Sequence, residues 1–179
     1  MKSTKLLVFA GVVLVSISCA DAPGITGPMD SAVALAAESS NATGPVAATG
    51  EYDAIVDFTT LTLTPRGSNC LLQVDGQLVF SGTIEGAATG TTTALVFATC
   101  PEVATAPPGT YPDVFKSELA FEGTIAGEPA AGDMMYQGRS QEGGRIEGHV
   151  IASRGIAGVL DVDAQLAVGG SYSGSLVVH

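Results

Sequence analysis

Hydrophobic and polar residues alternate with a period of two along most of the chain after residue 50. The pattern is clearest from Leu72 to Ile84, where one parity is apolar or glycine and the other is mainly polar. Such alternation is typical of a β-strand with one buried face and one face in water. It recurs over Phe115 to Ile125, Leu160 to Val168 and Tyr172 to Val178. Weaker strands are expected over Tyr52 to Thr64, Thr91 to Cys100, Met134 to Gly138 and Arg145 to Ala152. The sequence therefore predicts about eight strands.

The dipeptide Asp75-Gly76 lies inside the clearest alternating segment and is a common signal for a two-residue hairpin turn. A turn there would move Gln77, Ser81 and Thr83 onto the apolar face. We therefore expect a continuous strand through this dipeptide.

Four glycines, Gly82, Gly123, Gly148 and Gly174, fall on the apolar parity of their strands. Glycine weakens a strand and usually marks a sharp bend or a close approach of backbones. Bends repeated around a sheet allow it to close into a barrel. The alternative explanation is the general abundance of glycine, with 23 in the chain.

The glycine-containing segments resemble those of a known family. The segments are Phe80 to Gly86 (Phe-Ser-Gly-Thr-Ile-Glu-Gly), Phe121 to Gly127 (Phe-Glu-Gly-Thr-Ile-Ala-Gly), Gly155 to Leu160 and Gly170 to Gly174. They are similar to those of the allene oxide cyclase-like barrel family, in particular its small bacterial branch of uncharacterised function. The resemblance implies an all-β fold, an eight-stranded antiparallel barrel; an open β-sandwich is the alternative.

A barrel of eight strands encloses a space that side chains fill or that one small ligand occupies. The resemblance implies an apolar interior that could hold a small hydrophobic molecule. The chain has Tyr136-Gln137-Gly138-Arg139 where bacterial relatives often carry Gln-His-x-Gly, so no catalytic residue is carried over. The residues expected to line a ligand are Phe80, Phe121, Met134, Tyr136 and Tyr172.

The N-terminal segment predicts export. Lys2 and Lys5 precede the uncharged apolar run from Leu6 to Ile17, a pattern typical of a secretory signal peptide. Ser16-Ile17-Ser18-Cys19 resembles the bacterial lipobox, in which the cysteine is lipidated and becomes the mature N-terminus. We expect a signal peptide over residues 1–18, a disordered tether over residues 19–50 and a β-barrel domain over residues 51–179. Ordinary cleavage nearby, giving a soluble secreted protein, is the alternative.

Composition narrows the possible partners and predicts one covalent link. The formal net charge is −11, and phosphate backbones require clustered basic residues, so we expect no nucleic-acid partner. An exported domain folds where disulfides persist, and Cys70 and Cys100 remain once Cys19 is assigned to lipid. We expect them to form a disulfide, with two unpaired buried thiols as the alternative.

The other polar residues suggest no site. Asp161 and Asp163 share one face of a strand, but that face is expected to be in water. His149 has no Ser or Cys motif beside it, and we expect no metal and no cofactor. A proline-rich connection between Cys100 and Pro112 is the segment in which a lid would be sought.

We expect an exported lipoprotein of the periplasm or outer surface, held to the membrane through Cys19, whose barrel binds a small apolar ligand or serves as an interaction module. One alternative is a cyclase or isomerase that acts on an apolar substrate inside the barrel. The other is a structural envelope lipoprotein with a filled interior.

Overall fold

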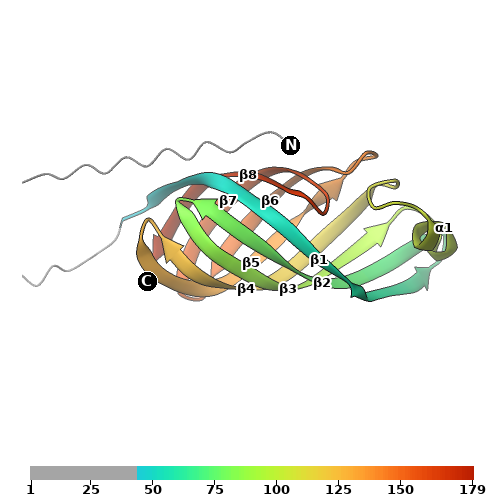
Figure 1. Cartoon of the computed structure of the whole chain (residues 1–179), viewed down its shortest axis with the longest axis horizontal. Helices are drawn as coiled ribbons and strands as arrows, with labels where there is room; N and C mark the ends of the chain where they lie inside the picture. Colours follow the sequence, from blue (N-terminus) through green and yellow to red (C-terminus); the bar gives the residue numbers. More distant parts are fainter. Residues whose placement is uncertain (1–43) are drawn as a thin grey trace, which may run out of the picture. The chain divides into compact units, whose positions relative to one another are not determined.

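The computed structural model describes residues 44–179, which form a closed barrel of eight antiparallel strands (Figure 1). Each strand pairs with its neighbours in sequence, and β1 pairs with β8 to close the barrel. The strands are β1 (Val46–Arg66), β2 (Asn69–Gly82), β3 (Ile84–Val96), β4 (Asp113–Ile125), β5 (Glu128–Ser140), β6 (Arg145–Ser153), β7 (Ile156–Gln165) and β8 (Gly169–Val178). The predicted barrel is therefore confirmed. The predicted signal peptide, Cys19 and the tether up to residue 43 lie outside the described residues.

The alternating pattern assigned the two faces of the strands correctly. In β2, Val74, Leu78 and Phe80 are buried while Asp75 and Val79 are exposed. The strand also runs without a turn through Asp75-Gly76, as expected. Strand parity is reliable here because each strand has one face on the interior of the barrel and one in water.

Several strand boundaries differ from the predicted ones. β7 ends at Gln165, so Val168, which was expected inside that strand, lies in the turn before β8 and is exposed. β2 ends at Gly82 and β3 begins at Ile84, so the segment expected as one strand contains a tight turn. Gly82 has a φ of 105°, a conformation that favours glycine. Parity does not reveal this turn, because the residues on both sides of it point inward. β3 ends at Val96, and Cys100 lies in a helix. β1 begins at Val46, which places residues 46–50 in the sheet and not in the tether.

Cross-strand glycines bring the backbones of neighbouring strands close together. Gly123 on β4 lies opposite Gly86 on β3, and a Cβ at Gly123 would collide with the carbonyl oxygen of Glu85. This close approach supports the view that glycines on the apolar parity have a structural purpose. They allow the strands to coil tightly around the interior.

One half of the barrel interior is filled by large side chains. Tyr172 on β8 is buried there, and its hydroxyl donates to the Ser81 carbonyl at 3.0 Å and accepts from the Ile84 N–H at 2.9 Å. Aromatic rings continue this core, with Phe80 lying 5.6 Å from Tyr172 and 6.2 Å from Phe121 between ring centroids. Further buried residues of this core are Ile84, Ile125, Met134, Ile156, Leu160 and Leu176.

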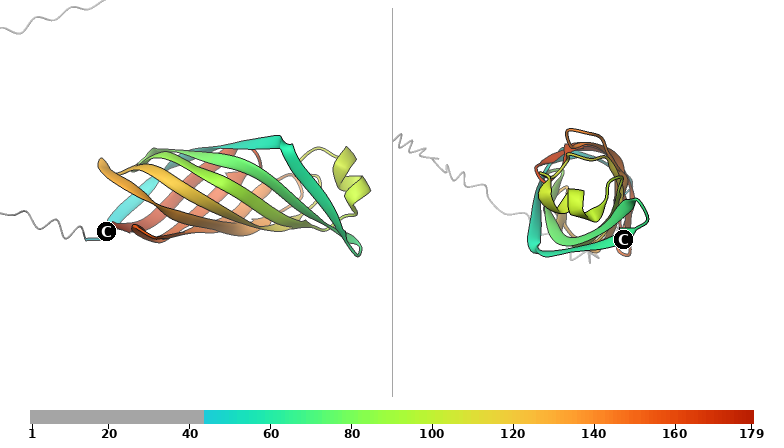
Figure 2. Two further views of the ribbon diagram at one scale, coloured as in Figure 1. Left: turned by 90° about the horizontal axis from the view of Figure 1, so that it is seen from below. Right: turned by 90° about the vertical axis from the view of Figure 1, so that its right-hand side faces the viewer.

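The only helix of the described residues, α1 (Cys100–Thr105), lies in the connection between β3 and β4. It sits across one end of the barrel, as both views in Figure 2 show. Within residues 44–179, no helix has the length and apolar character needed to cross a membrane.

Candidate ligand-binding site

A cavity of about 320 Å³ occupies the end of the barrel that α1 covers. Its walls come from inward-facing residues of β1 to β6, and its rim comes from α1, the loop after it and the β7–β8 turn. Most of these residues are apolar. The lining of the walls includes Tyr52, Ala54, Val56, Leu72, Val74, Leu78, Thr92, Ala94, Val96, Asp113, Phe115, Ser117, Leu119, Tyr136 and Ile146.

The rim of the cavity is shaped by an irregularity in β1. The pairing with β2 passes from Asp57 opposite Asp75 to Thr62 opposite Gln73, so residues 58–61 bulge out of register. Asp57 holds this bulge, because its carboxylate accepts hydrogen bonds from the backbone N–H and the hydroxyl of Thr59, at 3.0 and 2.6 Å. Bulges near sites commonly redirect side chains. Here the bulge brings Phe58 and Leu61 to the cavity.

Two large apolar side chains at the rim of the cavity are exposed to solvent. Ile55 and Phe58 both line the cavity, yet 55% and 54% of their surfaces are open to solvent. Residues on one face of a regular strand are an even number of positions apart. Val56 and Leu61 are both apolar but are separated by an odd number of positions, so the sequence already indicates a change of face between them. A bulge in this strand could therefore have been predicted.

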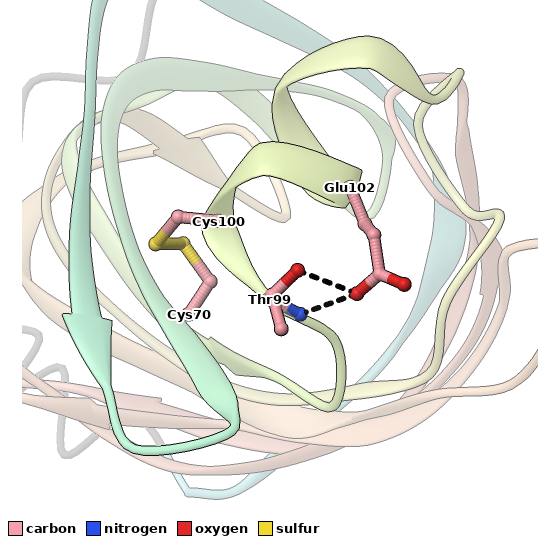
Figure 3. Close-up of a disulfide and its surroundings, with 4 residues drawn as sticks. All are labelled: Cys70, Thr99, Cys100 and Glu102. Atoms are coloured by element: carbon pink, nitrogen blue, oxygen red, sulfur yellow. Dashed lines mark hydrogen bonds between the residues drawn. A yellow bond between two sulfur atoms is a disulfide. The ribbon is translucent and has the colours of Figure 1, made fainter.

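The helix at the mouth is fixed to the barrel by the predicted disulfide. Cys100, the first residue of α1, is joined to the buried Cys70 of β2, and their Cα atoms are 4.8 Å apart (Figure 3). The predicted disulfide is confirmed.

Hydrogen bonds also fix the start of α1. The Glu102 carboxylate accepts hydrogen bonds from the backbone N–H and hydroxyl of Thr99, and these bonds lower the pKa of Glu102.

The connection between β3 and β4 covers the cavity, where a lid was sought from the sequence. Val103 and Ala104 of α1 line the cavity together with residues 106–111 of the following loop. None of the residues of α1 is fully buried. In addition to the backbone connections to β3 and β4, the disulfide joins this cover to β2 in the wall of the barrel.

Two tyrosines form the inner end of the cavity. The hydroxyls of Tyr52 on β1 and Tyr136 on β5 share a hydrogen bond of 3.0 Å. Burial raises the pKa of Tyr52 to about 12, partly opposed by this hydrogen bond, and burial also raises the pKa of Tyr136. Both hydroxyls therefore stay protonated at neutral pH, and they can offer hydrogen bonds to a ligand but no charge.

The remaining polar groups of the wall lie on β3 and β4. The Thr92 and Ser117 hydroxyls hydrogen-bond to each other at 2.7 Å. Asp113, at the start of β4, is only 7% exposed, and its Oδ1 has no hydrogen-bond partner among the described residues. Burial raises the pKa of Asp113, although the neighbouring Ser140 partly opposes the rise. The Ser140 hydroxyl, opposite Asp113 in the sheet, is also buried without a partner among these residues.

Asp113 was not among the expected site residues. The alternating pattern predicts a strand that begins at Phe115, with almost all charges on the outer face of the barrel. Extending the apolar parity of Phe115 and Leu119 two positions toward the N-terminus reaches Asp113. The signal for an inward carboxylate was therefore present in the sequence.

The residues expected to line a ligand separate into two groups. Tyr136 lines the cavity, together with Tyr52 and Phe115, which sequence analysis did not select. Phe115 packs against Tyr136 at 4.9 Å between ring centroids. The others are buried in the filled half of the barrel and do not line the cavity; they are Phe80, Phe121, Met134 and Tyr172.

The remaining polar candidates lie on the outer face of the barrel. Asp161 and Asp163 are exposed, as expected, and Asp163 pairs with Arg145 at 3.2 Å. His149 is half-buried and hydrogen-bonds to Gln137 at 2.8 Å. Among residues 44–179, no three His, Cys, Asp or Glu side chains are grouped so that they could hold a metal ion.

Comparison with solved structures finds a likeness in fold. A crystal structure of a protein with unknown function from the DUF3224 family of Shewanella oneidensis MR-1 is similar, with 17% sequence identity and a TM-score of 0.49. The likeness covers 76% of this chain and 98% of that chain. No protein-family model matches the chain, and none of the curated proteins does. The allene oxide cyclase-like resemblance stays a prediction, and functional inference rests on the geometry of the barrel.

Proposed function

We propose that the barrel binds one small, mainly apolar molecule in the cavity beneath α1. The observation that carries the proposal is a hollow of about 320 Å³ in an otherwise filled interior. Ligand pockets in proteins commonly enclose roughly 300 to 1,000 Å³ and combine apolar walls with a few polar groups. This cavity has that combination, with polar groups at Asp113, at the Thr92–Ser117 pair and at the two tyrosines.

The shape of the barrel supports binding over a purely structural purpose. Side chains such as Phe80, Phe121 and Tyr172 fill one half of the interior, whereas the other half, which Ala54 and Ala94 line, keeps a hollow of about 320 Å³. An unfilled apolar cavity destabilises a protein, by about 24 cal/mol per Å³ in engineered cases. A bound apolar molecule would restore the missing contacts.

The proposal also places the domain outside the cytoplasm, attached to a membrane through Cys19. The Cys70–Cys100 disulfide supports this location, because disulfides persist in oxidising compartments and are rare in the cytosol. The mass of the mature N-terminus distinguishes the two predicted forms. A lipidated Cys19 supports the anchor, and an unmodified N-terminus beyond Cys19 contradicts it.

Titration of the purified full chain with N-phenyl-1-naphthylamine, a neutral dye that fluoresces in apolar surroundings, tests ligand binding. We expect saturable binding of one dye molecule per chain, with a dissociation constant of about the micromolar order. The same protein, reduced and unfolded in denaturant, is the control and should give no saturable signal. Fluorescence that increases linearly with dye concentration in the folded protein would contradict the proposal.

A further inference from the structure

Asp113 is the one charged side chain among the described residues that line the cavity. It lies on the inward parity of β4, between the aromatic lining residues Tyr111 and Phe115. The remaining lining residues are apolar or carry neutral hydroxyl and amide groups. The electrostatic character of the cavity is therefore set by one carboxylate.

No cation of the described residues neutralises this carboxylate. The ion pairs of the barrel join exposed side chains, and Arg139, whose neighbour Ser140 lies opposite Asp113, pairs with Glu147 at 3.6 Å. The other pairs are Lys116 with Glu118, Arg145 with Asp163 and Arg154 with Asp133. Buried carboxylates are normally paired or fully hydrogen-bonded, because burial of an isolated charge is unfavourable. Asp113 has no paired cation and is not fully hydrogen-bonded, since its Oδ1 lacks a partner among these residues, although the neighbouring Ser140 partly offsets the effect of burial on its pKa.

A ligand in the cavity could supply the opposite charge that the carboxylate of Asp113 lacks. A protonated amine would form a charge-assisted hydrogen bond with the carboxylate, a stronger interaction than a neutral hydroxyl provides. Aromatic rings attract cations by their faces, and Tyr111, Phe115 and Tyr136 line the same cavity. An anionic group, such as the carboxylate of a fatty acid, would meet a like charge and no compensating cation.

We propose that the cavity selects molecules with an apolar body and a protonated amine, and that the ammonium group pairs with Asp113. This inference rests on the proposed function, since it concerns the same cavity. It assigns Asp113 the role of specificity determinant, and it excludes fatty acids and other apolar anions as the preferred ligands.

Competition with a matched series of eight-carbon compounds tests the inference. Octylamine, 1-octanol and octanoate are titrated at pH 7 against N-phenyl-1-naphthylamine bound to the full chain. We expect octylamine to displace the dye at a concentration about tenfold lower than octanol, and octanoate to be the weakest competitor. In Asp113→Asn, the advantage of octylamine over octanol should fall to within about threefold.

Asp161→Asn is the matched control, because it removes one acidic charge from the exposed outer face of the same barrel. It should leave the preference for octylamine unchanged. An equal fall in both variants would assign the preference to general attraction by the acidic surface and overturn the inference. Asp113→Ser is the second variant, used where Asp113→Asn does not fold.

The outcomes separate the inference from the proposed function. Equal competition by octylamine and octanol, or strongest competition by octanoate, overturns the role of Asp113 while the cavity still binds apolar molecules. Failure of the wild-type protein to bind the dye at all overturns the proposed function instead.

Discussion

Replacement of both Cys70 and Cys100 by serine lowers the free energy of unfolding by about 3 to 4 kcal/mol. The two residues are 30 positions apart, so the bond closes a loop that contains β3 and nearly all of β2. Without the bond, the unfolded chain has more conformational entropy than the chain with the closed loop, and this difference favours the unfolded state. Denaturant unfolding of the oxidised wild type and the double variant measures the difference.

The same substitution should also weaken ligand binding. The disulfide attaches α1 at its first residue, and apart from it α1 is held mainly by Val103, which is only partly buried against the cluster of Cys70, Val96 and Ala98. Release of the bond is therefore expected to leave the cover of the cavity poorly fixed. Ser173→Ala, at an exposed position on β8, is a control that should change neither quantity. A double variant as stable as wild type would show that the disulfide contributes little to the barrel.

Ala94→Phe abolishes most ligand binding while leaving the barrel folded. Ala94 lies on β3 and faces the hollow half of the interior. An added ring there occupies space that the ligand needs, and a clash of about 1 to 3 kcal/mol corresponds to roughly fivefold to 150-fold weaker binding. Titration with N-phenyl-1-naphthylamine measures the affinity, and thermal unfolding measures the stability, which should stay within about 1 kcal/mol of wild type.

Ala88→Phe provides the matched comparison. Ala88 lies on the same strand and the same inward face, six positions earlier, but it is fully buried in the filled half. The same added ring should destabilise the protein there by about 1 to 3 kcal/mol or more, because no space is present to receive it. Equal destabilisation by the two substitutions would contradict the division of the interior into a filled half and a hollow half.

The strands were predictable because parity reports burial directly. Alternation is clear through the middle of β4 and β7, where the apolar residues that the sequence indicates are buried; β4 also buries two polar residues, Asp113 and Ser117. The turn at Gly82 was hidden because Phe80 and Ile84 both point inward on either side of it. β1 appeared weak because its bulge reverses the parity between Val56 and Leu61.

The cavity was less predictable than the fold. Phe80 and Phe121 look like ligand-lining residues in the sequence, because parity tells which residues point inward but not how deep they lie along the barrel axis. The register of the strands sets that depth, and it places both aromatic rings in the filled half. The Cys70–Cys100 bond was predictable from the number of cysteines left after Cys19, whereas its position beside the cavity depends on the path of α1.

Location of a bound probe tests the central claim most directly. A crystal grown with 4-bromobenzyl alcohol would show the bromine position by its anomalous scattering. A hollow half-barrel that binds apolar molecules predicts one bromine inside the cavity, near Val74, Ala94 and Leu119. Bromine only on the outer surface, with the cavity closed by inward movement of its walls, would contradict it.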